Sequence, residues 1–260
     1  MNERKMPFIV AHRGASYAAP ENTLPSFLLA FKEDADFIEG DFWLTEDNRI
    51  VCLHDKHTLR TAPNQTNMNV VKSTYEEMEN LDFGDWKSEK FKNTRILLLE
   101  DLLKIIPEGK GIFIEIKDGR GKFLEELNNI LRRTNFPHRL IRIISFDPKV
   151  ITSSKKNFPD IKAYWIFEWL FKDDCNNMKS VLSKLLTTLD MINADGIDMN
   201  FSKGISGNII REIKNRGYDF VLYDVNTPED AFTMTKLGAD ALTTNYPAKI
   251  KKYLHEKFYK

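Results

Sequence analysis

Short apolar runs alternate with amphipathic segments along most of the chain. The apolar runs predict eight strands, at residues 8–12, 37–43, 112–117, 141–146, 161–167, 196–200, 219–223 and 240–244. Helical stripes lie between most of them, and one places Leu24, Phe27, Leu28 and Phe31 at positions i, i+3, i+4 and i+7. This alternation predicts an α/β fold, a TIM (β/α)8 barrel with a closed parallel sheet. An open doubly wound sheet is disfavoured, because no G-x-G-x-x-G motif follows the first strand.

One apolar run, residues 50–54, interrupts the alternation of strands and helices. Only residues 44–49 separate it from the strand at 37–43, which is too short a connection for a helical crossover. A hairpin is therefore expected. Asp47 and Asn48 both tolerate positive φ, so they predict a two-residue turn between the two strands.

The position of this turn predicts the register of the hairpin. With the turn centred on Asp47-Asn48, Asp41 faces His54 and Trp43 faces Cys52. Directly opposed side chains lie on one face of a sheet. Glu39, Asp41 and His54 are therefore expected to point the same way.

The length and composition fit one large domain. The chain has 260 residues and is 42% hydrophobic, which is enough for a full core over residues 1–260. Residues 56–98 are polar and irregular, and they predict a small insertion after the second barrel strand. Lys+Arg and Asp+Glu number 38 each, so no net charge draws the protein to nucleic acid or to an anionic membrane.

The apolar segments and cysteines predict a cytoplasmic protein. No stretch approaches the roughly 18 apolar residues of a membrane span, so stable membrane insertion is not expected. The residues before His12 lack the apolar region of a secretory signal. Cys52 and Cys175 have no C-x-x-C spacing, which is typical of reduced thiols, and Cys52 is expected in the core. The sequence leaves the oligomeric state open.

Candidate functional residues gather where predicted strands end. His12 ends the first strand and Arg13 begins the loop after it, and active sites of barrels form at the carboxyl ends of the strands. Glu115 and Lys117 interrupt an apolar strand at spacing i, i+2. Because burying unpaired charge is costly, both need partners. We expect these residues to share one rim with Glu39, Asp41 and His54.

This set of side chains is suited to the cleavage of a phosphodiester. The three carboxylates suit a hard divalent cation, Ca²⁺ or Mg²⁺, whereas Zn²⁺ normally takes more His or Cys ligands. Arg13 is able to bind a phosphate bidentately, and Lys117 adds a point charge. His12 and His54 are candidates for general base and general acid, in either order.

Several other polar residues have a structural interpretation. Asp147 followed by Pro148 is typical of a helix N-cap with Pro at the first helical position. Glu21 is expected to support the N-cap of the first helix, formed by Asn22 or Thr23. His57, His138 and His255 are expected to be solvated.

The chain resembles the glycerophosphodiester phosphodiesterase family at an ordered set of short motifs. They are His12-Arg13-Gly14, Pro20-Glu21-Asn22-Thr23, Glu39-Gly40-Asp41, His54-Asp55, Arg60-Thr61, Glu115-Ile116-Lys117, Ser145-Phe146-Asp147, Val225-Asn226 and Thr244-Asn245-Tyr246-Pro247. No single motif is specific, but their order over nearly the whole chain is.

The resemblance implies a TIM barrel that hydrolyses small-molecule glycerophosphodiesters, such as glycerophosphocholine, to glycerol 3-phosphate and an alcohol. The roles it implies are acid/base catalysis for His12 and His54, metal binding for Glu39, Asp41 and Glu115, and phosphate binding for Arg13 and Lys117. Tyr223 stands where the family often has Trp, and Asn245 where it often has Asp. Tyr223 is a candidate ring for the glycerol or head group, and the leaving alcohol stays open.

Three alternatives to this function are considered. The aromatic run at 164–171 favours a phospholipase D-like activity on lysophospholipids, with Trp169 and Phe171 as an apolar wall. A non-catalytic phosphate- or lipid-binding barrel is disfavoured, because both histidines and all three carboxylates are present. A zinc amidohydrolase is disfavoured by the lack of an H-x-H pair on the first strand. Direct attack by water and a cyclic phosphate intermediate both fit the sequence.

Overall fold

Eight parallel strands close into a barrel in the computed structural model, which describes residues 6–168 and 178–259. The barrel strands are β1 (Phe8–Ala11), β2 (Phe37–Leu44), β5 (Gly111–Ile116), β6 (Ile141–Ser145), β7 (Lys162–Phe167), β8 (Gly196–Asn200), β9 (Asp219–Tyr223) and β10 (Ala241–Thr244). The barrel closes because β1 pairs with β10 on one side and with β2 on the other. The predicted TIM barrel is thus confirmed, and each strand lies within one residue of its predicted bounds.

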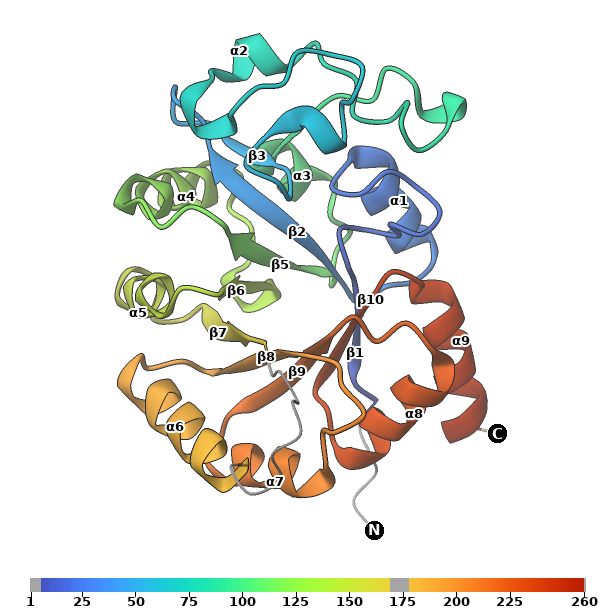
Figure 1. Cartoon of the computed structure of the whole chain (residues 1–260), viewed down its shortest axis with the longest axis vertical. Helices are drawn as coiled ribbons and strands as arrows, with labels where there is room; N and C mark the ends of the chain where they lie inside the picture. The colour runs from blue at the N-terminus through green and yellow to red at the C-terminus, as the bar shows by residue number, and fades with distance from the viewer. Residues whose placement is uncertain (1–5, 169–177, 260) are drawn as a thin grey trace.

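Helices cover the outside of these strands (Figure 1). They are α1 (Leu24–Lys32), α3 (Leu99–Ile105), α4 (Gly121–Thr134), α5 (Pro148–Asn157), α6 (Met178–Met191), α7 (Gly207–Asn215), α8 (Pro228–Leu237) and α9 (Pro247–Phe258). Their apolar stripes pack against the outward faces of the strands; in α4 the stripe includes Phe123, Leu127 and Ile130. As predicted, Asp147 caps α5 by accepting a hydrogen bond from the Lys149 N–H.

The interior of the barrel is filled by a separate apolar layer. Inward-facing side chains of the strands form this layer, and they are Val10, Phe37, Phe113, Ile144, Tyr164, Ile166, Val221 and Ala241. Phe37 and Phe113 meet edge to face, with ring centroids 5.4 Å apart. The layer fills the barrel below the carboxyl ends of the strands. Polar residues near those ends therefore lie above a closed apolar interior and not above an open channel.

Residues between β2 and α3 form a hairpin and a small layer of irregular structure beside it. The elements are β3 (Ile50–Cys52), η1 (Thr58–Arg60), η2 (Val70–Lys72), α2 (Tyr75–Met78), η3 (Glu89–Phe91) and β4 (Leu97–Leu98). This segment projects from one end of the molecule (Figure 1). It has an apolar cluster of its own, which includes Val70, Met78 and Phe83.

The hairpin forms as predicted, but its predicted register is wrong by one residue. Cys52 pairs with Phe42, not with Trp43, and the Leu53 N–H donates to the carbonyl of Asp41. The turn has three residues instead of two, because Thr45 and Arg49 close it and Asn48 takes a positive φ of 59°. Asp41 is therefore not directly opposite His54 in the ladder.

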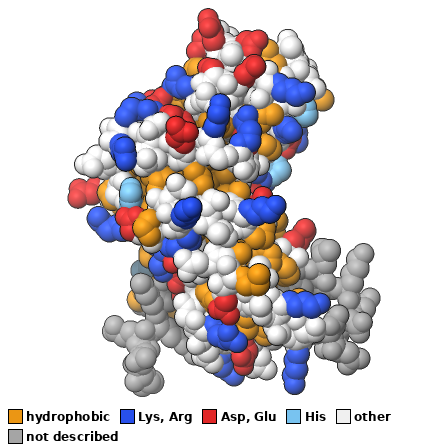
Figure 2. Space-filling view, turned by 90° about the vertical axis from the view of Figure 1, so that its left-hand side faces the viewer, with side chains coloured by type: hydrophobic (Ala, Val, Ile, Leu, Met, Phe, Trp, Pro, Cys, Tyr) orange, Lys and Arg blue, Asp and Glu red, His pale blue; other side chains and the backbone are white. Residues whose placement is uncertain are grey.

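Charged side chains of both signs are interspersed over the face shown in Figure 2, without a large patch of one sign. This agrees with the equal numbers of basic and acidic residues. In the described part of the chain, none of the helices combines the length and the apolar character needed to cross a membrane.

Candidate active site

The loop after β1 presents His12 and Arg13 at the carboxyl end of the barrel. The chain turns sharply there, since Arg13 has a φ of 54° and Gly14 a φ of 80°. Gly14 is required twice over, because its φ favours glycine and a Cβ there would lie 2.6 Å from the backbone carbon of Ser26. The turn brings the Arg13 N–H to Oε2 of Glu39, to which it donates a hydrogen bond of 2.9 Å.

Three buried carboxylates meet beside this loop. Glu39 and Asp41 lie on β2, and the parallel register pairs Asp41 with Glu115 of the neighbouring strand β5. Each of the three offers an oxygen within 4.8 Å of the others. Burial and the nearby charges of Asp41 and Glu115 hold the pKa of Glu39 well above its ordinary value. Oε1 of Glu39 is buried and has no hydrogen-bond partner.

Two cationic side chains partly neutralise the three carboxylates. Lys117 Nζ lies 3.0 Å from Asp41 and 2.6 Å from Glu115, while Arg13 Nε lies 3.1 Å from Asp41. Burial alone would raise the pKa of Asp41, but the charges of Lys117 and Arg13 outweigh it and lower that pKa. Burial and the charge of Asp41 raise the pKa of Glu115 to about 7, even though Lys117 opposes the shift.

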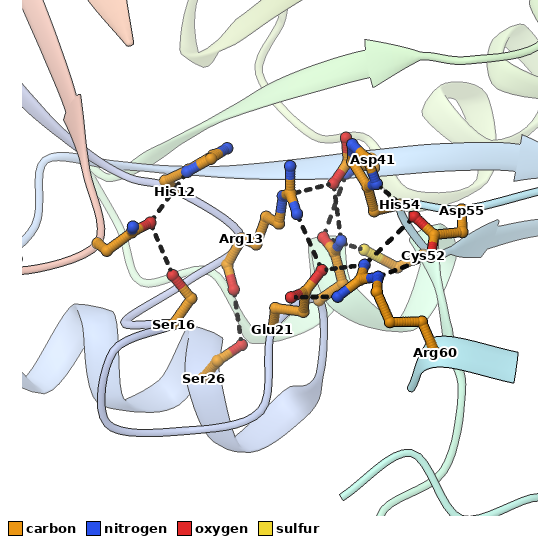
Figure 3. A network of polar contacts seen from close by, with 12 residues as sticks. His12, Arg13, Ser16, Glu21, Ser26, Asp41, Cys52, His54, Asp55 and Arg60 are labelled. Atoms are coloured by element: carbon orange, nitrogen blue, oxygen red, sulfur yellow. Dashed lines mark hydrogen bonds and ion pairs between the residues drawn. The ribbon is translucent and has the colours of Figure 1, made fainter. Parts of the chain in front are cut away.

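His12 is held by residues that directly follow the last two barrel strands, β9 and β10. Its Nδ1 lies 2.9 Å from Oδ1 of Asn245 and 3.4 Å from a carboxylate oxygen of Asp224. Ser16 also donates to Asn245 Oδ1, which fixes that amide (Figure 3). Burial and the charge of Arg13 lower the pKa of His12. With two acceptors facing Nδ1, the proton of the neutral ring belongs there, which leaves Nε2 as a base.

His54 reaches the same site from the hairpin. Its Nδ1 lies 2.6 Å from Oδ1 of Asp55, and Arg60 donates to the other oxygen of Asp55 at 2.6 Å. Arg60 also donates to Glu21, which accepts from Arg13 at 3.0 Å (Figure 3). Glu21 was expected to support the cap of α1, and that prediction is wrong. Thr23 and Ser26 form the capping box instead, which frees Glu21 to pair with the two guanidinium groups.

A cavity of about 170 Å³ unites the predicted site residues. It is lined by His12, Arg13, Glu39, His54, Glu115, Lys117 and Tyr223, all named from the sequence. Asp41 contacts the cavity's Lys117 and Arg13 and is 1% exposed. Tyr223 lies half-buried at the end of β9, where burial raises the pKa of its hydroxyl. Trp169 and Phe171, considered as an apolar wall, lie outside the described residues.

The sequence did not identify several polar residues of the site, among them Asp224, which lies beside His12. Asn22 was considered only as a helix cap, yet its side chain donates to Asp41 at 2.8 Å. Asp198 and Thr243 line the cavity from β8 and β10. Asp198 breaks an apolar strand as Glu115 does, and that interruption was the available signal.

The chain is similar in sequence to glycerophosphodiester phosphodiesterases. A family model described as "Glycerophosphoryl diester phosphodiesterase family" matches residues 12–249. The glycerophosphodiester phosphodiesterase of Caldanaerobacter subterraneus is 30% identical over 92% of this chain and 94% of its own length. A candidate enzyme of the same name from Bacillus subtilis, YhdW, is 32% identical over 92% of this chain and 95% of its own length.

Solved structures show the same fold. An Oleispira antarctica phosphodiesterase, in complex with the product sn-glycerol-3-phosphate, superposes with a TM-score of 0.82 at 24% identity, covering 96% of this chain and 97% of that one. A Silicibacter pomeroyi protein named for the same activity gives a TM-score of 0.84 at 20% identity, covering 97% and 94%.

Proposed function

The chain is an enzyme of the glycerophosphoryl diester phosphodiesterase family, and we propose that residues 1–260 act as one domain that hydrolyses small-molecule glycerophosphodiesters to glycerol 3-phosphate and an alcohol. The observation that carries this proposal is the shared cavity, which His12 and His54 line together with Glu39, Glu115 and the cations Arg13 and Lys117. Bases, carboxylates and cations within one small cavity are what the cleavage of an anionic diester requires.

We propose that Glu39, Asp41 and Glu115 hold one divalent cation, Ca²⁺ or Mg²⁺. The donor set is all oxygen, which fits these hard ions. Oε1 of Glu39 has no partner, and the pKa values of Glu39 and Glu115 are raised. Both features are expected of a cluster of carboxylates that has too little positive charge beside it, which a bound cation would supply. When bound, a divalent cation there polarises a phosphoryl oxygen and screens the carboxylates from one another.

The two cationic side chains are suited to orient the phosphate. Arg13 carries five N–H donors, and its contacts with Asp41 and Glu21 hold the guanidinium at the rim. Lys117 contacts both Asp41 and Glu115 and lines the same cavity as Arg13, so its charge lies beside the phosphate site that we propose. A diester bound between them has its negative charge neutralised before the reaction begins.

We propose His12 as the general base and His54 as the general acid. The neutral His12 ring presents an unprotonated Nε2, because Asn245 and Asp224 face Nδ1. Its lowered pKa keeps that ring neutral near pH 7. His54 is oriented by Asp55, which leaves its Nε2 directed away from that carboxylate, as a proton donor to the departing alcohol requires.

A substrate panel tests the function directly. The released glycerol 3-phosphate is measured with glycerophosphocholine, glycerophosphoethanolamine and glycerophosphoglycerol, before and after treatment with EDTA. We expect turnover that EDTA abolishes and that added Ca²⁺ or Mg²⁺ restores. Full activity after exhaustive chelation would refute the metal site. Turnover of lysophosphatidylcholine in place of the glycerol diesters would support a phospholipase D-like enzyme instead.

A further inference from the structure

The cavity contains two buried polar groups that no part of the proposed machinery uses. Asp198, on β8, is 2% exposed, and its Oδ1 has no hydrogen-bond partner. Thr243, on β10, is 1% exposed, and its Oγ1 has none either. Both side chains line the same cavity as His12 and Glu115. Throughout residues 6–168 and 178–259, no hydrogen bond or ion pair involves the carboxyl group of Asp198.

An unpartnered carboxyl in this position costs stability, so its presence calls for an explanation. Burying a carboxyl without a partner is unfavourable, and other carboxylates of the cavity avoid it. Glu39 accepts from the Arg13 N–H, and Glu115 pairs with Lys117. Asp198 also lies outside the group of three carboxylates that is suited to a metal ion. Since none of the described side chains supplies a partner, we infer that the partner of Asp198 is a molecule that enters the cavity.

The surroundings of Asp198 restrict what that partner is. Ile144 and Ile166 line the cavity with it, and they offer apolar contact to a short carbon skeleton. The carboxyl oxygens of Asp198 accept hydrogen bonds, while the Thr243 hydroxyl both accepts and donates. Apolar walls beside a few converging acceptors and donors are suited to a small molecule that carries hydroxyl groups.

We propose that Asp198 and Thr243 form a hydroxyl-binding subsite, in which they receive alcohol hydroxyls of the diester substrate. The inference deepens the proposed function and rests on it. Two parts of a substrate carry this chemistry: the glycerol that is common to all glycerophosphodiesters, and a hydroxylated leaving alcohol. In either case Asp198 and Thr243 determine specificity and do not take part in the proton transfers assigned to His12 and His54.

Three diesters separate these sources when turnover is measured with Asp198→Ala, Asp198→Asn and Thr243→Val. Glycerophosphocholine has hydroxyls only on its glycerol, glycerophosphoglycerol has them on both sides, and bis(p-nitrophenyl) phosphate has none. We expect Asp198→Ala to lower kcat/KM about 10- to 100-fold on hydroxylated diesters and to leave the third unchanged. Equal losses on the first two substrates identify the glycerol, and a loss on glycerophosphoglycerol alone identifies the leaving alcohol.

Three outcomes would overturn the subsite. They are an unchanged kcat/KM, an equal loss on bis(p-nitrophenyl) phosphate, and a loss confined to glycerophosphocholine, which would indicate binding of the choline cation. Thr235→Val is the matched control, since Thr235 is buried in α8 and its hydroxyl donates to the Ala231 carbonyl there. We expect this variant to keep the activity of the wild type on all three diesters.

Calorimetric binding keeps the inference testable if the wild type hydrolyses none of these diesters, a result that would refute the proposed function alone. Asp198→Ala is expected to weaken binding of glycerophosphoglycerol, which has hydroxyls on both sides of its phosphate, about tenfold or more and to leave binding of inorganic phosphate unchanged. Equal effects on both ligands, or no effect on either, would overturn the subsite.

Thermal unfolding distinguishes recognition from a structural role. Asp198→Asn keeps the shape of the side chain and removes a buried carboxyl that has no partner, so we expect a Tm equal to or above that of the wild type. A lowered Tm together with an unselective loss of activity would assign Asp198 to the fold instead. If Asp198→Ala does not fold, Thr243→Val carries the same comparison, because it removes the hydroxyl and nearly keeps the shape of the side chain.

Discussion

The side chain of Asn22 pairs reciprocally with Asp41. Its Nδ2 donates to the Asp41 carboxylate at 2.8 Å, and its Oδ1 accepts from the Asp41 N–H at 3.2 Å. Asn22 holds a positive φ of 58°, so the loop after β1 bends to present this amide. A side chain from the loop after β1 therefore helps to orient a carboxylate on β2.

We predict that Asn22→Ala weakens Ca²⁺ or Mg²⁺ binding about 10- to 100-fold, because the carboxylate loses the partner that orients it. The free energy of unfolding is expected to fall by about 1–3 kcal/mol, since Asp41 is buried. Calorimetric metal titration and urea unfolding measure the two effects. Asn93→Ala is the control, because Asn93 also has a positive φ, 65°, but is exposed. Equal metal affinity in the two variants would contradict the prediction.

We predict that His12→Ala and His54→Ala each lower kcat about 10²- to 10⁴-fold, with the fold retained. His138→Ala is a matched control for His54, because His138 pairs with Asp160 at 2.7 Å much as His54 pairs with Asp55. It lies in η4 (His138–Leu140), outside the cavity. Steady-state kinetics and circular dichroism measure the outcome. Near-normal turnover in either site variant would remove that histidine from the mechanism.

We predict that the metal-free protein loses stability as pH rises from about 5 to 7. Glu115 has a pKa of about 7 in the folded protein and near 4.5 when unfolded, so the native state binds more protons in this window. Urea unfolding in EDTA at several pH values measures the slope. Glu115→Gln is expected to lack its share of that slope. A stability difference between wild type and variant that does not change with pH would contradict this account.

We predict that Gly14→Ala is strongly destabilising, by more than about 3 kcal/mol, because the added Cβ meets the backbone of Ser26. Gly109→Ala separates this clash from backbone strain, since Gly109 has a similar φ of 79° with no atom within 4 Å of the added Cβ. That control is expected to cost only about 1–2 kcal/mol. Equal melting temperatures for the two variants would show that strain alone matters at Gly14.

The barrel was predictable because buried parallel strands are continuous apolar runs in the sequence. Glu39 and Asp41 on one strand and Glu115 on another stood out against those runs, and the closed sheet then brings them together. The apolar runs, and the charged residues that interrupt them, carried most of this information.

Other features depend on contacts that no local pattern shows. The register of the hairpin follows from the left-handed conformation of Asn48, which adds a third residue to the turn. The role of Glu21 depends on Arg60, which lies 39 positions farther along the chain. Asp198 is one acidic residue in an apolar strand, and only the cavity shows that its carboxyl is unpartnered.

The ion pairs of Glu21 give the insertion a part in how the rim is maintained. Arg60 of the insertion and Arg13 of the first loop share this one carboxylate. Because the insertion has an apolar cluster of its own, we expect it to open locally while the barrel stays folded. Each such opening removes a partner from the Glu21 network. We therefore expect hydrogen exchange in the loop after β1 to rise whenever the insertion opens.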